Sequence, residues 1–125
     1  MKILAIETAT EACSAALEID NSCMYRHEIA PRKHAELILP MIDSLLNEAD
    51  IKVNSLDVIA LGCGPGAFTG VRIAIGVAQG LAFPFDIPVL PVSTLAALAQ
   101  QFSKDYNYVA TAIDARMKEI YWGLY

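Results

Sequence analysis

Four glycines fall within nine residues of this chain, in the segment Gly62-Cys63-Gly64-Pro65-Gly66-Ala67-Phe68-Thr69-Gly70. The segment follows the apolar run 58–61 and leads into a long apolar stretch with helical periodicity. Because glycine has no Cβ, it adopts positive φ angles and lets another backbone or a ligand approach closely. A turn of this kind between a strand and a helix either holds an anion at the helix N-terminus or shapes the fold.

The glycine segment departs from two familiar phosphate-binding patterns. A Walker loop ends in Gly-Lys-Ser/Thr, whereas Gly70 is followed by Val71 and no lysine is near. A dinucleotide-binding turn reads Gly-x-Gly-x-x-Gly, whereas the pattern from Gly64 reads Gly-x-Gly-x-x-x-Gly, and Pro65 lacks an N–H group. We therefore interpret the segment as a structural or partner-facing turn. The alternative is a phosphate site, for which the candidate residues are Thr8, Gly64, Gly66 and Thr69.

Length and composition limit the classes of function. The chain has 125 residues, of which 55% are hydrophobic and 18% charged, and this apolar surplus predicts an oligomer or partner interface on one domain. The net charge is −5 and no cluster of basic residues extends beyond Arg32-Lys33. A protein that binds nucleic acid by itself needs a basic surface, so any contact with RNA is expected to depend on a partner.

Cysteine spacing and hydropathy indicate a cytoplasmic protein. Cys13, Cys23 and Cys63 form neither a C-x-x-C pair nor a zinc-site pattern, so we expect buried thiols in a reducing compartment. Glu7 follows the start too soon for a signal peptide. We also expect no apolar run of the roughly 18 residues that a membrane span requires.

Alternating short apolar runs and helical patterns predict an α/β fold. Strands are expected over residues 3–6, 13–19, 23–29, 56–61, 88–92, 108–113 and 120–125, with a tight hairpin at Asp20-Asn21. Helices are expected over 34–50, 68–83 and, capped by Ser93, up to residue 102. Three antiparallel strands followed by helix, strand, helix and strand match a ribonuclease H-like mixed sheet with helices packed on it. Because the chain stops within an apolar strand, residues 1–125 are interpreted as one lobe of a longer protein.

Two of the predicted helices are too apolar to face a single sheet. The helix over 34–50 has apolar residues around about half of its circumference, and the one over 68–83 is apolar nearly all round. Gly76 and Gly80 lie four residues apart and would allow another helix to approach closely. The alternative is that both helices are ordinary core elements.

No arrangement of residues predicts a catalytic or metal site. Glu7 and Asp114 fall at strand ends and could together hold Mg²⁺, but two carboxylates are few for such a site, so we expect each to cap a turn. His27 and His34 form no metal-binding pair, and His34 is expected to lie at a helix entrance. No Gly-x-Ser-x-Gly nucleophile motif is present.

Four segments resemble the TsaB (YeaZ) family, and together the resemblance covers essentially the whole chain. They are residues 3–17, 34–37, 64–72 and 114–121, and the most specific is Gly64-Pro65-Gly66-Ala67-Phe68-Thr69-Gly70-Val71-Arg72. The resemblance implies the actin, hexokinase and Hsp70 superfamily, with two ribonuclease H-like lobes of which this chain corresponds to the first. It implies a non-catalytic partner of the transferase TsaD, joined by the ATPase TsaE, in making threonylcarbamoyladenosine in tRNA.

The resemblance also implies where partners bind. In the family the two first-lobe helices form the homodimer and TsaD interface, which here assigns Leu37, Met41, Leu45, Arg72, Ile75, Gly76, Gln79 and Phe83 to a partner surface. No cofactor or metal is expected on this chain, ATP and Mg²⁺ are expected only in the complex, and tRNA only through the complex.

Two departures from related sequences bear on catalysis. The family usually carries Asp where this chain has Glu7, and the metal-binding histidine pair of TsaD has no counterpart here. The alternatives that remain are a nucleotide-binding phosphotransferase lobe and a homologue of the M22 metallopeptidases, the name under which this branch is also known.

Overall fold

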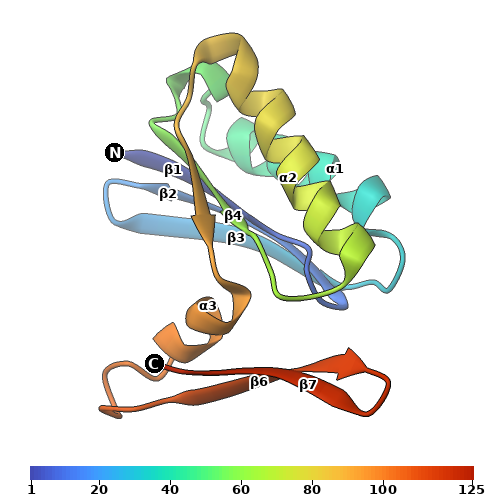
Figure 1. The fold of residues 1–125 in the computed structure, drawn as a ribbon. Helices are drawn as coiled ribbons and strands as arrows, with labels where there is room; N and C mark the ends of the chain where they lie inside the picture. Colours follow the sequence, from blue (N-terminus) through green and yellow to red (C-terminus); the bar gives the residue numbers. More distant parts are fainter.

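The computed structural model describes all residues, 1–125. Its main sheet has five strands in the order β3-β2-β1-β4-β5, and a separate two-stranded sheet pairs β6 with β7 (Figure 1). The strands are β1 (Lys2–Glu7), β2 (Ala12–Ile19), β3 (Ser22–Ile29), β4 (Val58–Gly62), β5 (Val89–Val92), β6 (Ala110–Arg116) and β7 (Glu119–Leu124). The helices are α1 (His34–Glu48), α2 (Phe68–Ala82) and α3 (Thr94–Gln100), with single 3₁₀ turns η1 (Val53–Ser55) and η2 (Phe83–Phe85).

The first three strands form an antiparallel meander, and the later strands add in parallel on its other edge. β1 pairs antiparallel with β2 and β2 with β3, whereas β1 pairs in parallel with β4 and β4 with β5. At the β2–β3 turn Asp20 and Asn21 have φ angles of 48° and 69°. Positive φ at both residues of a two-residue hairpin turn matches the right-handed twist of the flanking strands. The predicted mixed sheet and its hairpin are therefore confirmed.

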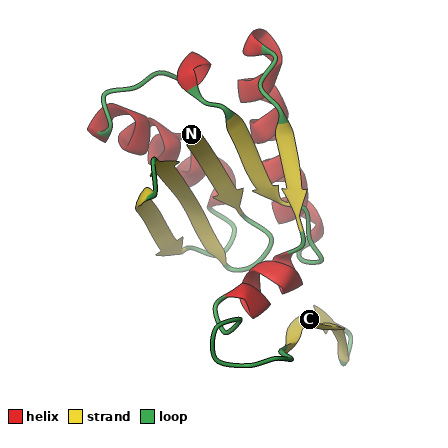
Figure 2. Ribbon diagram, turned by 90° about the vertical axis from the view of Figure 1, so that its left-hand side faces the viewer, coloured by secondary structure: helices red, strands yellow, loops and turns green.

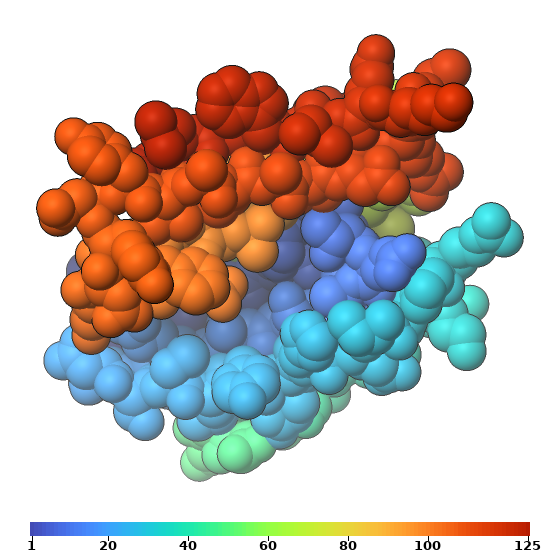
Figure 3. All heavy atoms as spheres, turned by 90° about the horizontal axis from the view of Figure 1, so that it is seen from below, coloured from blue at the N-terminus to red at the C-terminus, as the bar shows by residue number.

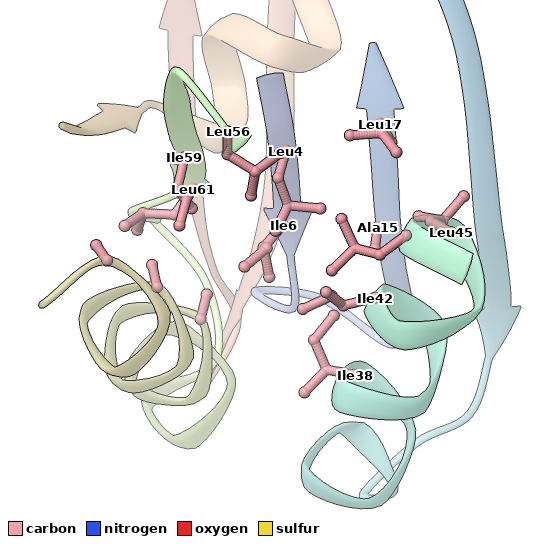
Figure 4. Packing of buried hydrophobic residues seen from close by; sticks show 14 of the residues in the cluster. Leu4, Ile6, Ala15, Leu17, Ile38, Ile42, Leu45, Leu56, Ile59 and Leu61 are labelled. Atoms are coloured by element: carbon pink, nitrogen blue, oxygen red, sulfur yellow. The ribbon is translucent and has the colours of Figure 1, made fainter. Parts of the chain in front are cut away.

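Helices α1 and α2 cover one face of the main sheet. Strand residues alternate between the two faces, so Leu4 and Ile6 of β1 point toward the helices while Ala5 points away. On the covered face they meet Ile38 and Ile42 of α1 in one hydrophobic cluster of 16 buried residues (Figure 4). Arg26 of β3 forms an ion pair with Glu48, the last residue of α1, and so links this end of the helix to the sheet.

Helix α3 and the β6–β7 hairpin lie beyond one end of the main sheet (Figure 2). Ser93 caps α3 as predicted, because its Oγ accepts a hydrogen bond from the Ala96 N–H at 3.3 Å. The helix ends at Gln100, two residues earlier than expected, and the strand predicted from residue 108 begins at Ala110.

Two expectations about exposure and hydropathy are wrong. Only Cys13 is buried, and burial, with a smaller contribution from Glu28, raises the pKa of its thiol. Cys23 and Cys63 are exposed, because one lies on an edge strand and the other in the turn after β4. The segment Phe68–Phe85 is long and apolar enough, by length and composition, to cross a membrane, contrary to expectation. Ala74, at the centre of α2, nevertheless packs in the core against the sheet.

Candidate partner interface

The glycine turn is fastened to the loop that follows β1. Thr8 donates a hydrogen bond from its hydroxyl to the carbonyl oxygen of Gly70 at 2.6 Å, and the Ala67 N–H donates to the Ala9 carbonyl at 2.7 Å. On the other side, the carbonyl oxygen of Gly64 accepts from the Thr94 N–H at 2.9 Å. The turn therefore joins β1, α2 and the start of α3.

Close packing explains why this turn requires glycine. A Cβ added at Gly70 would collide with the carbonyl oxygen of Thr8, and one at Gly66 with that of Ala9. Gly64 has a φ of +93°, which glycine adopts without strain. These three glycines thus have structural roles, in keeping with the interpretation of the segment as a turn that shapes the fold.

Three of the four residues of the alternative phosphate site are engaged in close contacts with other residues of the chain. Thr8 is fully buried and its hydroxyl is bonded to Gly70, so a phosphate would have to displace that bond. Thr69 is exposed in the first turn of α2, whereas Thr8 is buried. The structure brings Gly66, Gly70 and Thr8 together, and their contacts hold the glycine turn against the loop after β1.

Glu7 and Asp114 each cap a turn, as predicted. Glu7 accepts hydrogen bonds from the Ala9 N–H at 2.7 Å and from the Thr94 hydroxyl at 3.0 Å. Asp114 belongs to the other sheet, where it accepts from the Arg116 N–H at 2.7 Å. Within residues 1–125 no group of three or more His, Cys, Asp or Glu residues is placed to hold a metal ion.

The two histidines lie apart in the fold. His34 is the first residue of α1, as expected of a residue at the helix entrance, and its Nε2 is 3.2 Å from the carbonyl oxygen of Ala12. His27 lies exposed on the edge strand β3.

Helix α2 presents a continuous strip to solvent, which we call the α2 strip. Its members are all exposed and lie on one side of the helix and of η2, and they are Phe68, Arg72, Gly76, Gln79, Gly80 and Phe83. Phe68 is 71% exposed and Phe83 is 87% exposed, although both are large apolar side chains. Between them a Cβ added at Gly76 or Gly80 would meet nothing within 4 Å. The strip therefore has two aromatic ends and a flat centre.

A stacked pair forms the N-terminal end of the α2 strip. The Arg72 guanidinium carbon lies 3.4 Å from the centroid of the Phe68 ring, and Arg72 Nη1 donates to the Phe68 carbonyl oxygen at 3.3 Å. Such a stack holds a cation in a fixed place on an otherwise apolar surface. The strip therefore carries one positive charge near its beginning, and its other members are uncharged.

The side chains predicted on α1 divide between core and surface. Leu45 is fully buried among the cluster residues, so its assignment to a partner interface is wrong: it lies on the side of α1 that faces the sheet. Leu37 and Met41 are half-buried and pack against the same cluster, as does Ile75 of α2. These three keep part of their surface accessible, and their role at an interface stays a prediction.

Sequence reasoning missed two exposed apolar residues, Phe68 and Leu39. Leu39 of α1 is 50% exposed. The helical pattern contained a signal for Phe68, because it precedes Arg72 by four residues and so shares its face. Leu39 belongs to the broad apolar arc of the helix predicted over 34–50, and periodicity alone does not tell which edge of a broad arc is left uncovered.

Comparison with known proteins identifies related sequences. A family described as TsaD, tRNA N6-adenosine threonylcarbamoyltransferase, matches residues 27–125. A tRNA threonylcarbamoyladenosine biosynthesis protein TsaB from Haemophilus influenzae is 48% identical, over 98% of this chain and 52% of its own length. The protein of the same name from Escherichia coli is 47% identical, over all of this chain and 55% of its own length. The chain thus spans about half the length of these relatives.

Solved structures confirm the fold. The chain matches a structure described as YeaZ from Pseudomonas aeruginosa with a TM-score of 0.94 and 54% identity, covering 99% of this chain and 59% of the other. A second structure from Pseudomonas aeruginosa, with the same TM-score and identity, is described as an uncharacterized protein with similarity to peptidase YeaZ. The predicted ribonuclease H-like fold of the actin superfamily is borne out by these matches.

Proposed function

Since this chain belongs to the TsaB (YeaZ) family, we propose that it serves as a scaffold subunit, without catalysis of its own, for TsaD in threonylcarbamoyladenosine modification of tRNA. The observation that carries the proposal is the α2 strip. A large apolar area that stays uncovered on a folded domain marks a site of association.

The shape of the α2 strip suits a partner helix. Gly76 and Gly80 leave the helix backbone open at the centre of the strip, so a second helix can lie close to it. Phe68 and Phe83 stand at the two ends and supply apolar area with little conformational entropy to lose. Leu37, Met41 and Ile75 extend the surface with their accessible edges, and Gln79 offers an amide within it.

The rest of the proposed assembly follows from family membership. TsaD occupies the α2 strip in the complex, and a second copy of this chain occupies it when TsaD is absent. TsaE joins the complex, tRNA reaches this chain only through it, and ATP and Mg²⁺ act there. The proposed setting is the cytoplasm, where tRNA modification takes place.

Gly76→Leu in the full-length protein tests the role of the strip. Because a Cβ at Gly76 meets nothing within 4 Å, we expect a leucine there to leave the fold intact and to fill the space for the partner helix. We expect TsaD to bind at least about tenfold more weakly, equivalent to about 1.4 kcal/mol. Isothermal titration with purified TsaD measures the change, and circular dichroism checks the fold.

Lys104→Leu is the matched control. It also adds an exposed leucine, but in the loop between α3 and β6, and Lys104 has no hydrogen-bond partner to lose. It should bind TsaD as the parent protein does. Unchanged TsaD binding by a folded Gly76→Leu variant would refute the proposal.

The proposed absence of catalysis has a separate test. Supporting it, the Thr8 hydroxyl donates to Gly70, and the two Glu7 carboxylate oxygens accept from Ala9 and Thr94. A phosphotransferase lobe should bind Mg-ATP in calorimetric titration, and a metallopeptidase should contain zinc by elemental analysis. Micromolar Mg-ATP binding by the chain without TsaD, or stoichiometric zinc, would contradict the absence of catalysis while leaving the docking result unaffected.

A further inference from the structure

The two edges of the main sheet differ in how well they are protected against pairing with another strand. β5 is four residues long and contains Pro91, which has no N–H group to offer. β3 has eight residues, none of them proline or glycine, and no strand of the chain pairs with its outer side. Figure 3 shows β3, in light blue, open to view and apart from the β6–β7 hairpin. A long unpaired edge of this kind is a template for a strand of another molecule.

One backbone hydrogen bond fixes which residues of β3 point outward. The Ala30 N–H donates to the Glu11 carbonyl oxygen at 3.1 Å, in register with the β2–β3 ladder. Hydrogen-bonded and non-hydrogen-bonded pairs alternate along an antiparallel ladder, so every second residue of β3 bonds to β2. The residues between them turn their N–H and C=O groups away from the sheet, and they are Cys23, Tyr25, His27 and Ile29.

The apolar side chains of this edge match a second copy of the same strand laid antiparallel to it. When His27 lies opposite His27 of the second copy, Tyr25 of each copy lies opposite Ile29 of the other. Tyr25 is 69% exposed and Ile29 is 63% exposed, and both lie on the face of the sheet that turns away from α1. Pairs of an aromatic and a β-branched residue across two strands are favourable. All three pairs use outward-pointing backbone groups, so each can exchange two hydrogen bonds.

The charged side chains match in the same register. Arg26 of each copy lies opposite Glu28 of the other, at the non-hydrogen-bonded positions where side chains come closest. Glu28 has no cation within 4 Å in its own chain, whereas Arg26 pairs with Glu48. Centring the pairing on Glu28 would place two carboxylates opposite each other, and centring it on Tyr25 would place Arg26 opposite Met24. Only the register centred on His27 therefore satisfies the backbone, the apolar residues and the charges together.

Helix α1 leaves room for this pairing. It lies mainly over β2, and the β2 strands of the two copies would stand three strand spacings apart, or about 14 Å. Packed helices approach to about 8–10 Å, so the two α1 helices would not collide. The side of α1 toward β3 carries Ser44, whose Oγ accepts from Arg26 Nε at 3.1 Å, and Glu48. This side is polar and stays hydrated above the joined strands.

We propose that β3 pairs antiparallel with β3 of a second copy of this chain, centred on His27, and that the two main sheets thereby join into one. The match of the strand with itself favours a second copy over an unrelated strand. Pro31 ends the pairing, because it would lie opposite Cys23 of the other copy and has no N–H group. The inference does not rest on the proposed role with TsaD, since α2 packs on β1, β4 and β5 and the α2 strip stays accessible.

Disulfide trapping in the full-length protein tests the pairing. In the proposed register the Cα atoms of the two His27 residues lie about 5.5 Å apart, which is within the range of a disulfide. His27→Cys is made in a background where Cys23→Ser and Cys63→Ser remove the exposed thiols. We expect this protein to form a covalent dimer under mild oxidation.

The matched control retains Cys23 as its only exposed thiol, with Cys63→Ser and native His27. Cys23 lies on the same edge, but in the proposed register the two Cys23 residues are eight positions apart along the strands, or about 27 Å. We expect at least about tenfold more covalent dimer from His27→Cys than from the control, because pairing holds only the first two thiols together.

Proline substitution tests the backbone pairing without breaking the ladder inside the sheet. His27→Pro removes an outward N–H group, so the β2–β3 hydrogen bonds stay while the central intermolecular pair is lost. Cys23→Pro is the matched control, because it also removes an outward N–H group but lies beyond the paired residues. Sedimentation velocity is measured in a Gly76→Leu background, which obstructs association through the α2 strip. We expect His27→Pro to raise the dissociation constant of the dimer at least about tenfold and Cys23→Pro to leave it unchanged.

Glu28→Arg repeats the sedimentation test if His27→Pro fails to fold, because it places two cations opposite each other in the dimer. Equal trapping of the two cysteine proteins would overturn the inference, as would association that neither His27→Pro nor Glu28→Arg weakens. A Gly76→Leu protein that remains monomeric at its highest soluble concentration would overturn it as well.

Discussion

The two sides of α2 use small residues for opposite purposes. On the inner side Gly70, Ala74, Ala78 and Ala82 follow one another at intervals of four residues and are all buried. On the outer side Gly76 and Gly80 have the same spacing, yet a Cβ on either meets nothing within 4 Å. Inside, small residues let the helix approach β1 and β4. Outside, they leave a flat place that the chain itself does not use.

This difference shows that a pattern of small residues does not tell which surface it serves. The inner side packs against atoms of the same chain, such as the Thr8 carbonyl oxygen that lies against Gly70. The outer side has no such contact within residues 1–125, which is the basis of the proposed scaffold role. Substitutions on the two sides of one helix should therefore have effects of opposite sign on stability.

Gly70→Ala should have the largest effect. The new methyl group collides with the carbonyl oxygen of Thr8, and because that atom belongs to the backbone it has little freedom to move. We expect the free energy of unfolding to fall by about 3 kcal/mol or more, at the upper end of the cost of overpacking. Urea denaturation followed by circular dichroism measures the loss, and a change under about 1 kcal/mol would mean that the contact is looser than described.

Thr8→Val should have the next largest effect. Valine keeps the shape of the threonine side chain but removes the hydroxyl that donates to the Gly70 carbonyl, and with it a hydrogen bond between the loop after β1 and α2. The loss of one such hydrogen bond costs about 0.5–1.5 kcal/mol. The same denaturation experiment measures it, with Thr69→Val as control, since Thr69 is exposed and has no hydrogen-bond partner. Equal stability of the two variants would show that the Thr8–Gly70 bond does not hold the turn.

Gly76→Ala should change stability in the opposite direction. Alanine is favoured over glycine in an exposed helix interior by about 0.5–1 kcal/mol, and here its methyl group meets nothing. Thermal unfolding at several protein concentrations separates this gain from any change in self-association. A loss of stability that does not depend on concentration would mean that the outer side of α2 is occupied within the chain, contrary to the comparison.

Patterns within single elements allowed most of the fold to be predicted. The short apolar runs of β1 to β3, the Asp20-Asn21 turn and the helical spacing of residues 34–50 each reflect local geometry, and each led to an element that the structure contains. The turn-capping roles of Glu7 and Asp114 were also predicted, because a carboxylate at a strand end has backbone N–H groups within reach. Local chemistry was enough in these cases.

Which residues of a broad apolar arc are buried and which are exposed could not be predicted, because this depends on tertiary packing. Leu45 was assigned to a partner surface and lies in the core, whereas Leu39 on the same helix is half exposed. Both residues belong to an arc wider than the sheet contact needs, and only the placement of α1 against β2 decides between them. The burial expected of Cys23 failed for the same reason, since no pattern within β3 shows that it is an edge strand.

Arg72→Gln should have the smallest effect on stability, and it tests a single contact on the outer side of α2. The guanidinium lies 3.4 Å from the Phe68 ring centroid, at an exposed site where such a stack contributes about 0.5–1 kcal/mol. We expect the loss of stability not to exceed this amount. A double-mutant cycle with Phe68→Leu isolates the pair, because the coupling energy excludes what each side chain contributes alone. A coupling energy near zero would mean that the stack is not maintained in solution, so that the Phe68 ring and the Arg72 charge approach a partner independently.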